Sequence, residues 1–442
     1  MTEKPGLPGI PRMLGMHITT LGCKLNQHDS AELAGSLRTA AGPVHDPAAA
    51  RLIVVNTCTV TGAADADARQ ILRRRRRESP AALIVATGCY AERSPETLAS
   101  MPEVDLVLKR ADRPRAARII LDALRLRFPD ELSDGCADRV VEEGLPDFGD
   151  RTRAYLRVQD GCDLRCSYCV IPRVRGESRS LPAEAVESRL RRLLDAGYRE
   201  VVLTGVNTGE YGRDLDTATD LARLLERLVR LPGDYRLRLN SVEPRCVTPA
   251  LVDLIASEAR IARHLQIPLQ SGSDTVLSRM RRNYRTGRYQ KIVWSLRNRI
   301  PEIALGADVI VGFPGETEEE FGETLRFLES SPLNYLHVFS YSRRPGTPAA
   351  VSPDQITPPV IRERSRTLRE VGRRLSHAFK SGQVGRLHRA LVLHGTHPDG
   401  RLRGLTSNFI EVALEGRSTP NSFLDLRIDR VEPDGEAVAF AA

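Results

Sequence analysis

Residues 153–180 read RAYLRVQDGCDLRCSYCVIPRVRGESRS, and this stretch gives the clearest indication of the architecture of the central part of the chain. An apolar run, RAYLRVQ, is followed at once by Cys162, Cys166 and Cys169 in the spacing C-x3-C-x2-C. Three thiolates on one short loop can bind three irons of a cubane cluster, which leaves the fourth iron open to a small molecule. Chemistry at a metal requires such an open coordination position. The stretch therefore predicts a catalytic iron–sulfur site directly after a β-strand.

A zinc site or a set of buried thiols is the alternative for these cysteines. Structural zinc takes four protein ligands, and the sequence places no fourth Cys or His near the loop. We therefore favour the cluster. Tyr168, which precedes the third cysteine, is a candidate to pack beside a bound adenine.

Outward from this loop, apolar runs alternate with stretches of helical periodicity, which predicts βα units. The expected strands are RAYLRVQ, EVVLTG, YRLRLNS, RHLQIPL, IALGADVIV and YLHVFSYS. The expected helices between them include residues 183–196, 219–230 and 317–330. Six such units predict an incomplete (β/α)6 barrel with its active residues at the carboxyl ends of the strands. We expect this barrel, with a long basic terminal helix at residues 359–380, to occupy residues 151–381.

Two further domains are expected on either side of the barrel. In residues 14–128, the apolar runs HITTL, RLIVVN, ALIVAT and VDLVL alternate with amphipathic stretches such as 30–40 and 63–77, which is typical of a doubly wound parallel sheet. Residues 129–150 are acidic, contain Gly and Pro, and predict a linker. Residues 382–442 show short strands between turns and predict a small β-barrel. The fold class is therefore α/β with an appended β-barrel.

Three more cysteines each follow an apolar run of the first domain. Cys23 lies in TLGCKLNQ, Cys58 in VNTCTVT and Cys89 in ATGCYAE. The carboxyl ends of parallel strands meet at one edge of a sheet, where open α/β sheets bind their ligands, so these three residues can converge. A single isolated cysteine is more often a core thiol, but three at equivalent positions favour a second cluster with an open iron. Cys136 and Cys246 have no spaced partner, and we expect neither to bind metal.

The charge of the chain bears on its partners. The formal net charge over 442 residues is +8, and 60 of the 65 basic residues are arginine. A polyanionic partner and a genome that favours Arg codons both explain this balance. Two stretches favour the partner, because residues 260–299 carry ten Arg or Lys and one acid, and residues 361–380 carry seven bases and two acids.

The same composition limits where the protein acts. The sequence contains no run of eighteen apolar residues and no apolar segment near its start that resembles a secretory signal. We therefore expect a cytoplasmic protein without a membrane partner. In a reducing compartment, eight cysteines favour metal binding or catalysis over disulfides.

Longer phrases identify a family. The C-x3-C-x2-C loop that opens a six-unit barrel resembles the radical S-adenosylmethionine superfamily, and the three N-terminal cysteines narrow the resemblance to the methylthiotransferases. The likeness extends from His17 nearly to the C-terminus and includes the phrases RVRGESRS, LTGVNTGEYG, IPLQSGSDTVLSRMRRNY, VGFPGETEEEF and HVFSYSRRPGTPA. The last sixty residues resemble the TRAM module, a small RNA-binding barrel, and residues 404–409 (GLTSNF) match its characteristic phrase.

The resemblance implies two [4Fe–4S] clusters and S-adenosylmethionine as cofactors. In such enzymes one S-adenosylmethionine is cleaved to a 5′-deoxyadenosyl radical at the cluster of Cys162, Cys166 and Cys169. A second supplies the methyl group, and the cluster of Cys23, Cys58 and Cys89 holds or donates the sulfur. Residues at expected strand ends are candidates to contact S-adenosylmethionine, although ordinary turn chemistry explains them equally well: Gly205, Asn207, Ser241, Glu243 and Gln270.

Three branches of this family differ in their target. They act on isopentenyladenosine in tRNA, on threonylcarbamoyladenosine in tRNA, or on an aspartate of a ribosomal protein. Gly22-Cys23-Lys24-Leu25-Asn26-Gln27 most resembles the threonylcarbamoyladenosine branch, and so does Ile171-Pro172-Arg173-Val174-Arg175-Gly176. The implied partners are therefore the anticodon stem-loop of tRNA and a reductant such as flavodoxin or ferredoxin, with no DNA. The competing hypothesis from another class is a non-catalytic iron–sulfur protein that binds RNA.

Overall fold

The computed structural model describes residues 14–131 and 144–442. Its internal contacts divide the chain into two compact units. The first unit comprises residues up to 149 together with Arg173–Arg175, and the second comprises Asp150–Pro172 and Gly176–Ala442. Cys136 and much of the expected linker lie outside the described residues. Within the described ranges, no helix is long and apolar enough to cross a membrane.

The first unit is built on a five-stranded sheet in which every neighbouring pair of strands is parallel. The strand order is β2-β1-β3-β4-β5. The strands are β1 (Leu14–Thr20), β2 (Ala41–Pro43), β3 (Leu52–Thr57), β4 (Leu83–Gly88) and β5 (Leu106–Val107). The chain continues from β1 to β2 on one side and then crosses to β3 on the other side of β1. The strand order therefore reverses between β1 and β3, which is where doubly wound sheets bind ligands.

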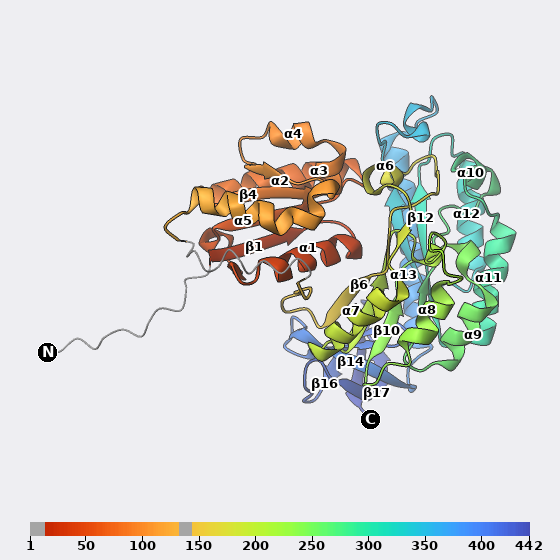
Figure 1. Ribbon diagram of the computed structural model, residues 1–442. Helices are drawn as coiled ribbons and strands as arrows, with labels where there is room; N and C mark the ends of the chain where they lie inside the picture. The colour runs from red at the N-terminus through yellow and green to blue at the C-terminus, as the bar shows by residue number, and fades with distance from the viewer. Residues whose placement is uncertain (1–13, 132–143) are drawn as a thin grey trace. The chain divides into compact units, whose positions relative to one another are not determined.

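Helices cover both faces of this sheet (Figure 1). They are α1 (Lys24–Leu37), α2 (Gly62–Glu78), α3 (Cys89–Arg93), α4 (Pro95–Ala99) and α5 (Ala116–Arg127). Alternate residues of β3 face opposite sides, so that Leu52 and Val54 share a core with Ile120 of α5, whereas Ile53 and Val55 share one with Leu72 of α2. Burial on both faces explains why the strands are continuous apolar runs in the sequence.

The second unit contains six parallel strands in two three-stranded sheets, β6-β9-β10 and β11-β12-β13. A single β-bridge between Leu237 and Ile261 links β10 to the segment just before β11. The strands are β6 (Arg153–Arg157), β9 (Glu200–Thr204), β10 (Arg236–Leu239), β11 (His264–Gln266), β12 (Ala304–Val311) and β13 (Tyr335–Ser340). The expected incomplete parallel barrel is confirmed, and β6 and β13 are its two edges.

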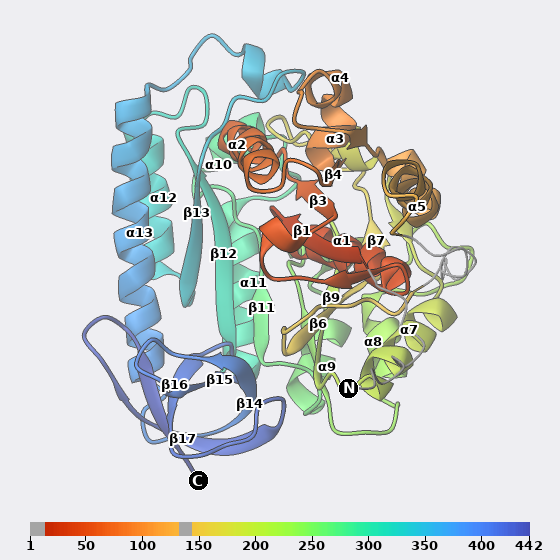
Figure 2. The ribbon, with the colours of Figure 1, turned by 90° about the vertical axis from the view of Figure 1, so that its left-hand side faces the viewer.

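The outer helices of this half barrel include the three that we expected between strands and three that we did not specify. The expected helices are α7 (Ala183–Asp195), α8 (Leu221–Leu228) and α12 (Glu318–Ser330). The others are α9 (Pro249–Ser257), α10 (Asp274–Arg279) and α11 (Thr286–Arg299). The long terminal helix, α13 (Pro358–Ser381), runs beside β13 towards the C-terminal barrel (Figure 2).

The C-terminal residues form a closed five-stranded barrel in the order β14-β15-β16-β18-β17. The strands are β14 (Leu387–Thr396), β15 (Leu402–Thr406), β16 (Glu411–Glu415), β17 (Phe423–Val431) and β18 (Ala437–Ala441). Three of them, β14, β16 and β17, coincide with the apolar runs HRALVLH, FIEVAL and FLDLRIDRVE, which predict strands in the sequence. We did not predict β15 and β18 individually, because β15 (LRGLT) contains a glycine and β18 (AVAFA) is mostly alanine, and both residue types are depleted in strands.

A buried ion-pair network attaches this barrel to the amino ends of the parallel strands. The Glu200 side chain is fully buried and accepts hydrogen bonds from Arg236 Nε at 2.6 Å and Arg238 Nε at 2.9 Å. The two guanidinium groups also donate to barrel carbonyls, at 2.7 Å to Leu405 and 3.1 Å to Thr406. The neighbouring arginines hold the pKa of Glu200 well below its usual range although burial opposes this. The barrel is therefore bound through charged groups that have no access to water.

We predict that Glu200→Gln lowers the free energy of unfolding by about 3–5 kcal/mol, because it leaves two buried guanidinium groups without their counter-charge. Glu329→Gln is the matched control, since Glu329 pairs with Arg374 on the surface and its loss costs at most about 1 kcal/mol. Urea unfolding of the two variants and the wild type measures both. Equal midpoints for the two variants would contradict the proposed role of the network.

Candidate active site and metal centres

The three N-terminal cysteines lie at the carboxyl ends of three neighbouring parallel strands. Cys58 directly follows β3, Cys89 directly follows β4, and Cys23 comes three residues after β1. Two of these strands flank the reversal of strand order. The cysteines thus occupy the position where a doubly wound sheet binds ligands, as their spacing in the sequence predicted.

The thiols are close enough to affect one another's ionisation. Burial raises the pKa of the Cys58 thiol, and it raises the pKa of Cys89 to about 11. A negative charge on Cys23 raises both further. Buried thiols of this kind become thiolates when a metal supplies the compensating charge. The donor set therefore suits a metal centre.

Two glycines allow the backbone to approach closely at this edge of the sheet. A Cβ atom on Gly22 would lie 2.9 Å from the Cys58 sulfur, and one on Gly88 would lie 2.3 Å from the Asn56 side-chain oxygen. Both glycines also have positive φ angles, of 91° and 92°, which other residues rarely adopt. A side chain at position 22 would fill space beside the Cys58 thiol, whereas one at position 88 would collide with the end of β3.

Asn26 is a positioning residue that the sequence suggested only as a mark of the family branch. It is buried, and its Nδ2 donates to the carbonyl of Leu21 at 2.8 Å and to that of Thr57 at 3.1 Å. The Cys89 sulfur lies 3.9 Å from Asn26 Oδ1. Asn26 therefore ties the loop after β1 to the end of β3, and so fixes Cys23 relative to Cys58.

The second cysteine site lies on the loop between β7 (Gln159–Asp160) and α6 (Ile171–Arg175). Backbone hydrogen bonds fix this loop: Ser167 N–H donates to the carbonyl of Met280 at 3.0 Å, and Ala349 N–H donates to the carbonyl of Ser167 at 2.9 Å. Tyr168 packs in an apolar cluster with Phe313 and Tyr341, beyond the ends of β12 and β13. The loop is therefore held at the carboxyl end of the half barrel.

In this loop Cys166 is buried, whereas Cys162 and Cys169 are half-buried. Burial, reinforced by a neighbouring charge on Cys166, raises the pKa of Cys162 to about 11 and that of Cys169 to about 12. Such thiols become thiolates when a metal supplies the compensating charge, so this donor set also suits a metal centre.

Arg282 is the main site residue that the sequence analysis missed. It is buried, and its Nη1 donates to the Cys166 sulfur at 3.2 Å, while its Nη2 donates to the Glu243 carboxylate. Burial raises the pKa of Glu243, and Arg282 opposes the shift. Of the expected S-adenosylmethionine contacts, Glu243 thus already has a cationic partner beside the cluster loop.

The other expected cofactor contacts also lie beyond the carboxyl ends of barrel strands. Gly205 and Asn207 follow β9, Ser241 follows β10, and Gln270 follows β11. Asn207 N–H donates to Gln159 Oε1 at 2.8 Å, whereas its buried side-chain oxygen has no hydrogen-bond partner among the described residues. Gln270 is held with a φ of 68° and exchanges backbone hydrogen bonds with β12. An unpaired acceptor on Asn207 is what a polar cofactor at this edge could satisfy.

Two other features of the sequence have structural roles. The Cys246 thiol donates to Glu210 at 2.9 Å. Two arginines of the basic stretch 260–299 have structural roles. Arg282 is buried in it, and Arg260 donates to the carbonyls of Leu231 and Gly233.

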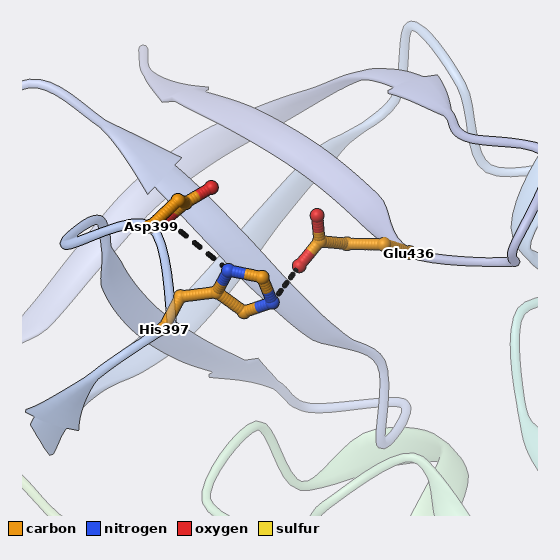
Figure 3. Close-up of side chains that lie close together, drawn as sticks. All are labelled: His397, Asp399 and Glu436. Atoms are coloured by element: carbon orange, nitrogen blue, oxygen red, sulfur yellow. Dashed lines mark ion pairs between the residues drawn. The ribbon is translucent and has the colours of Figure 1, made fainter.

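One group of potential metal ligands lies elsewhere, on the C-terminal barrel (Figure 3). His397 Nδ1 lies 3.1 Å from Asp399, and Glu436 lies on the other side of the ring. Arg401 reaches both carboxylates, at 2.5 and 2.9 Å, and holds the pKa of Asp399 well below its usual range. Arg401 already pairs with both acids, so the group is an ion-pair network.

Comparison with known proteins identifies families and chains to which this sequence is similar. The Radical SAM superfamily matches residues 156–328, and a group described as Uncharacterized protein family UPF0004 matches residues 15–109. The threonylcarbamoyladenosine tRNA methylthiotransferase MtaB of Bacillus subtilis is 39% identical over 90% of this chain and 89% of its own. The Thermotoga maritima protein of the same name is 35% identical over 96% of each chain.

Relatives with another name are nearly as similar. The ribosomal protein uS12 methylthiotransferase RimO of Desulforudis audaxviator is 38% identical over 83% of each chain. Among solved structures, the radical S-adenosylmethionine methyltransferase TsrM of Kitasatospora setae, with cobalamin and a [4Fe-4S] cluster bound, superposes with a TM-score of 0.55 at 16% identity. It covers 77% of both chains and shares the fold.

We predict that Arg282→Met lowers the free energy of unfolding by about 3–5 kcal/mol, because it leaves the buried Glu243 carboxylate unpaired. Adding Glu243→Gln should recover part of this loss, since the double variant buries no uncompensated charge. Urea unfolding of the cluster-free protein measures the cycle. Strictly additive losses would show that the two side chains do not interact.

Proposed function

Because the chain belongs to the radical S-adenosylmethionine methylthiotransferase family, we propose that it adds a methylthio group to C2 of threonylcarbamoyladenosine next to the anticodon of tRNA. The observation that carries the proposal is the pair of three-cysteine sites, each at the carboxyl ends of parallel strands. Membership of the family makes the chain an enzyme, which sets aside a purely RNA-binding iron–sulfur protein.

Family membership implies one [4Fe–4S] cluster and S-adenosylmethionine, and the structure fits both. Cys162, Cys166 and Cys169 would hold the cluster, and three thiolates leave one iron for the cofactor. Together these groups supply hydrogen-atom abstraction from a C–H bond that no acid or base can ionise. The side-chain oxygen of Asn207 offers a polar contact at the same edge.

The protein's own groups prepare this site. Arg282 places a fixed positive charge against the Cys166 sulfur and is itself held by Glu243. Tyr168 packs into the apolar cluster behind the loop, which excludes water from one side of it. A one-electron donor such as flavodoxin or ferredoxin completes the proposal, because the chemistry consumes electrons from outside the chain.

A second cluster at Cys23, Cys58 and Cys89 is part of the proposal. Three observations support it: the strand-end positions, the raised pKa values of the Cys58 and Cys89 thiols, and the space that Gly22 leaves beside Cys58. Such a centre would hold the sulfur that is transferred. The same donor logic applies as at the barrel, since three thiolates leave one iron without a protein ligand.

The choice of substrate rests on the relatives and on one phrase. Chains named MtaB are 33–39% identical over at least 90% of this chain. The phrase Gly22 to Gln27 supports the same branch. Since chains named RimO reach 38% identity, an aspartate of a ribosomal protein is the second candidate substrate, and isopentenyladenosine of tRNA is the third.

We predict that tRNA from a host lacking this activity gains 2-methylthio-threonylcarbamoyladenosine when the wild-type protein is expressed. Cys162→Ala and Cys58→Ala should each abolish the product, because each removes a ligand from one cysteine site. Cys246→Ser is the matched control and should retain it, since that thiol bonds to Glu210 instead. Mass spectrometry of tRNA nucleosides measures all four samples.

If the wild-type protein yields no 2-methylthio-threonylcarbamoyladenosine under iron-replete growth, the assignment of threonylcarbamoyladenosine as the substrate is wrong. A methylthiolated isopentenyladenosine in the same digest would move the chain to that branch. A mass increase on a ribosomal protein from the same cells would move it to the third.

A further inference from the structure

We propose that a groove between β13 and α13 binds the sugar–phosphate backbone of the tRNA substrate. This groove, here called the β13–α13 groove, has a volume of about 830 Å³. It is lined by Tyr335, Leu336, His337 and Ser340 of the strand and by Arg362, Ser365, Arg366, Arg369, Gly372, Arg373 and Ser376 of the helix. The inference deepens the proposed function by naming where its substrate is held.

The charge of the groove is the first argument. Four of its lining residues are arginines and none is acidic. Arg366 and Arg373 form exposed pairs with Glu363 and Glu370 on the same helix, and such surface pairs bind weakly. Among the residues that the structure describes, Arg362 and Arg369 have no ion-pair partner. The groove therefore presents uncompensated positive charge.

The spacing of these arginines suits a linear polyanion. Arg362, Arg366, Arg369 and Arg373 follow one another at intervals of three or four residues, so they share one side of the helix. With a rise of about 1.5 Å per residue, the row extends about 16 Å along the helix axis. Close packing holds the helix against the strand, since a Cβ on Gly372 would lie 3.3 Å from Leu336 Cβ. The row of charge therefore lies along a rigid wall.

The two ends of the groove give it a direction. Ser340 is the last residue of β13, and the next residue, Tyr341, packs in the same apolar cluster as Tyr168 of the cysteine loop. At the opposite end, α13 contacts β17, and Lys380 donates to the carbonyl of Gly435 at 2.6 Å. The lining residues therefore follow α13, which runs beside β13 from the neighbourhood of the cysteine loop towards the C-terminal barrel (Figure 2).

A polymer is the occupant that fits this course. A small anion would use one arginine, whereas a nucleic acid that reaches the cysteine loop with one nucleotide carries further phosphates along the row. His337 lines the groove and its side chain is 48% exposed, so an unstacked base could pack against its aromatic ring. An acidic protein segment would match the charge but gives no reason for an exposed aromatic beside it.

The C-terminal barrel does not offer the same surface through its family phrase. Thr406 and Asn408 are buried, and the carbonyls of residues 405–407 accept from Arg236 and Arg238. This phrase docks the barrel onto the strands instead of facing solvent. RNA held near the reaction centre therefore needs another basic surface. The β13–α13 groove supplies one, because it lies between the cysteine loop and the C-terminal barrel.

The test compares Arg362→Gln/Arg369→Gln with Arg230→Gln/Arg326→Gln in the cluster-loaded full chain. The control removes two equally exposed arginines of the same unit that lie outside the groove. The probe is end-labelled tRNA from a host lacking the methylthio modification, and fluorescence anisotropy gives Kd between 0.05 and 0.2 M KCl. We expect the groove variant to bind about tenfold more weakly at 0.1 M salt, and its log–log salt slope to fall by about 1.4–1.8.

Three outcomes would overturn the inference. The first is a groove variant whose Kd and salt slope equal those of the control variant. The second is a loss of turnover without a change in the KM for tRNA, because the groove is assigned to binding alone. The third is displacement of the labelled tRNA from the wild type by polyglutamate as readily as by polyuridylate of equal charge, which would assign the groove to an acidic protein.

Nucleoside analysis of the same protein separates this inference from the proposed function. If the wild type methylthiolates the threonylcarbamoylated tRNA and the groove variant binds normally, the groove is wrong and the function stands. If the groove variant binds weakly but the wild type makes no methylthio nucleoside, the RNA surface stands and the substrate assignment is wrong.

Discussion

The parallel direction of the strands is the constraint on which both cysteine sites depend. Because every strand of the first unit points the same way, the residues that follow β1, β3 and β4 meet at one edge. Cys23, Cys58 and Cys89 are 35 and 31 positions apart along the chain, yet each needs only a short loop to reach the same place. The half barrel applies the same rule to its cysteine loop and to Asn207 and Gln270. An antiparallel sheet would distribute these residues over two opposite edges.

Buried charge is the energetic cost of this arrangement, and the chain offsets it with pairing. Thiols with raised pKa values are poor ligands until a metal compensates them, so cluster binding and ionisation are linked. Glu243 is held by Arg282 beside one such site, and Glu200 is held by Arg236 and Arg238 at the opposite ends of the strands. Both pairs combine salt bridges with further hydrogen bonds, which is the condition under which buried ions are tolerated. The reaction end and the docking end of the barrel are therefore each fixed by a paired carboxylate.

The sequence predicted those elements whose signal is local. Continuous apolar runs identified the parallel strands. The six cysteines could be identified as site residues because they follow such runs, and residues that follow parallel strands lie at one edge of the sheet. It did not predict the role of Arg282, since an arginine inside a basic stretch carries no local mark of burial. Arg236 and Arg238 alternate with leucines in β10 and so resemble a solvated face. Their partner is a carbonyl-rich segment about 170 residues later, and periodicity shows which residues share a face but not what covers it.

The iron content of the purified protein shows whether the chain carries two separate three-thiolate sites. After anaerobic reconstitution, we expect about eight irons per wild-type chain and about four in each of two triple variants, Cys23→Ala/Cys58→Ala/Cys89→Ala and Cys162→Ala/Cys166→Ala/Cys169→Ala. About four irons in the wild type, unchanged by the N-terminal triple substitution, would exclude a second site and leave the barrel loop as the sole cluster site.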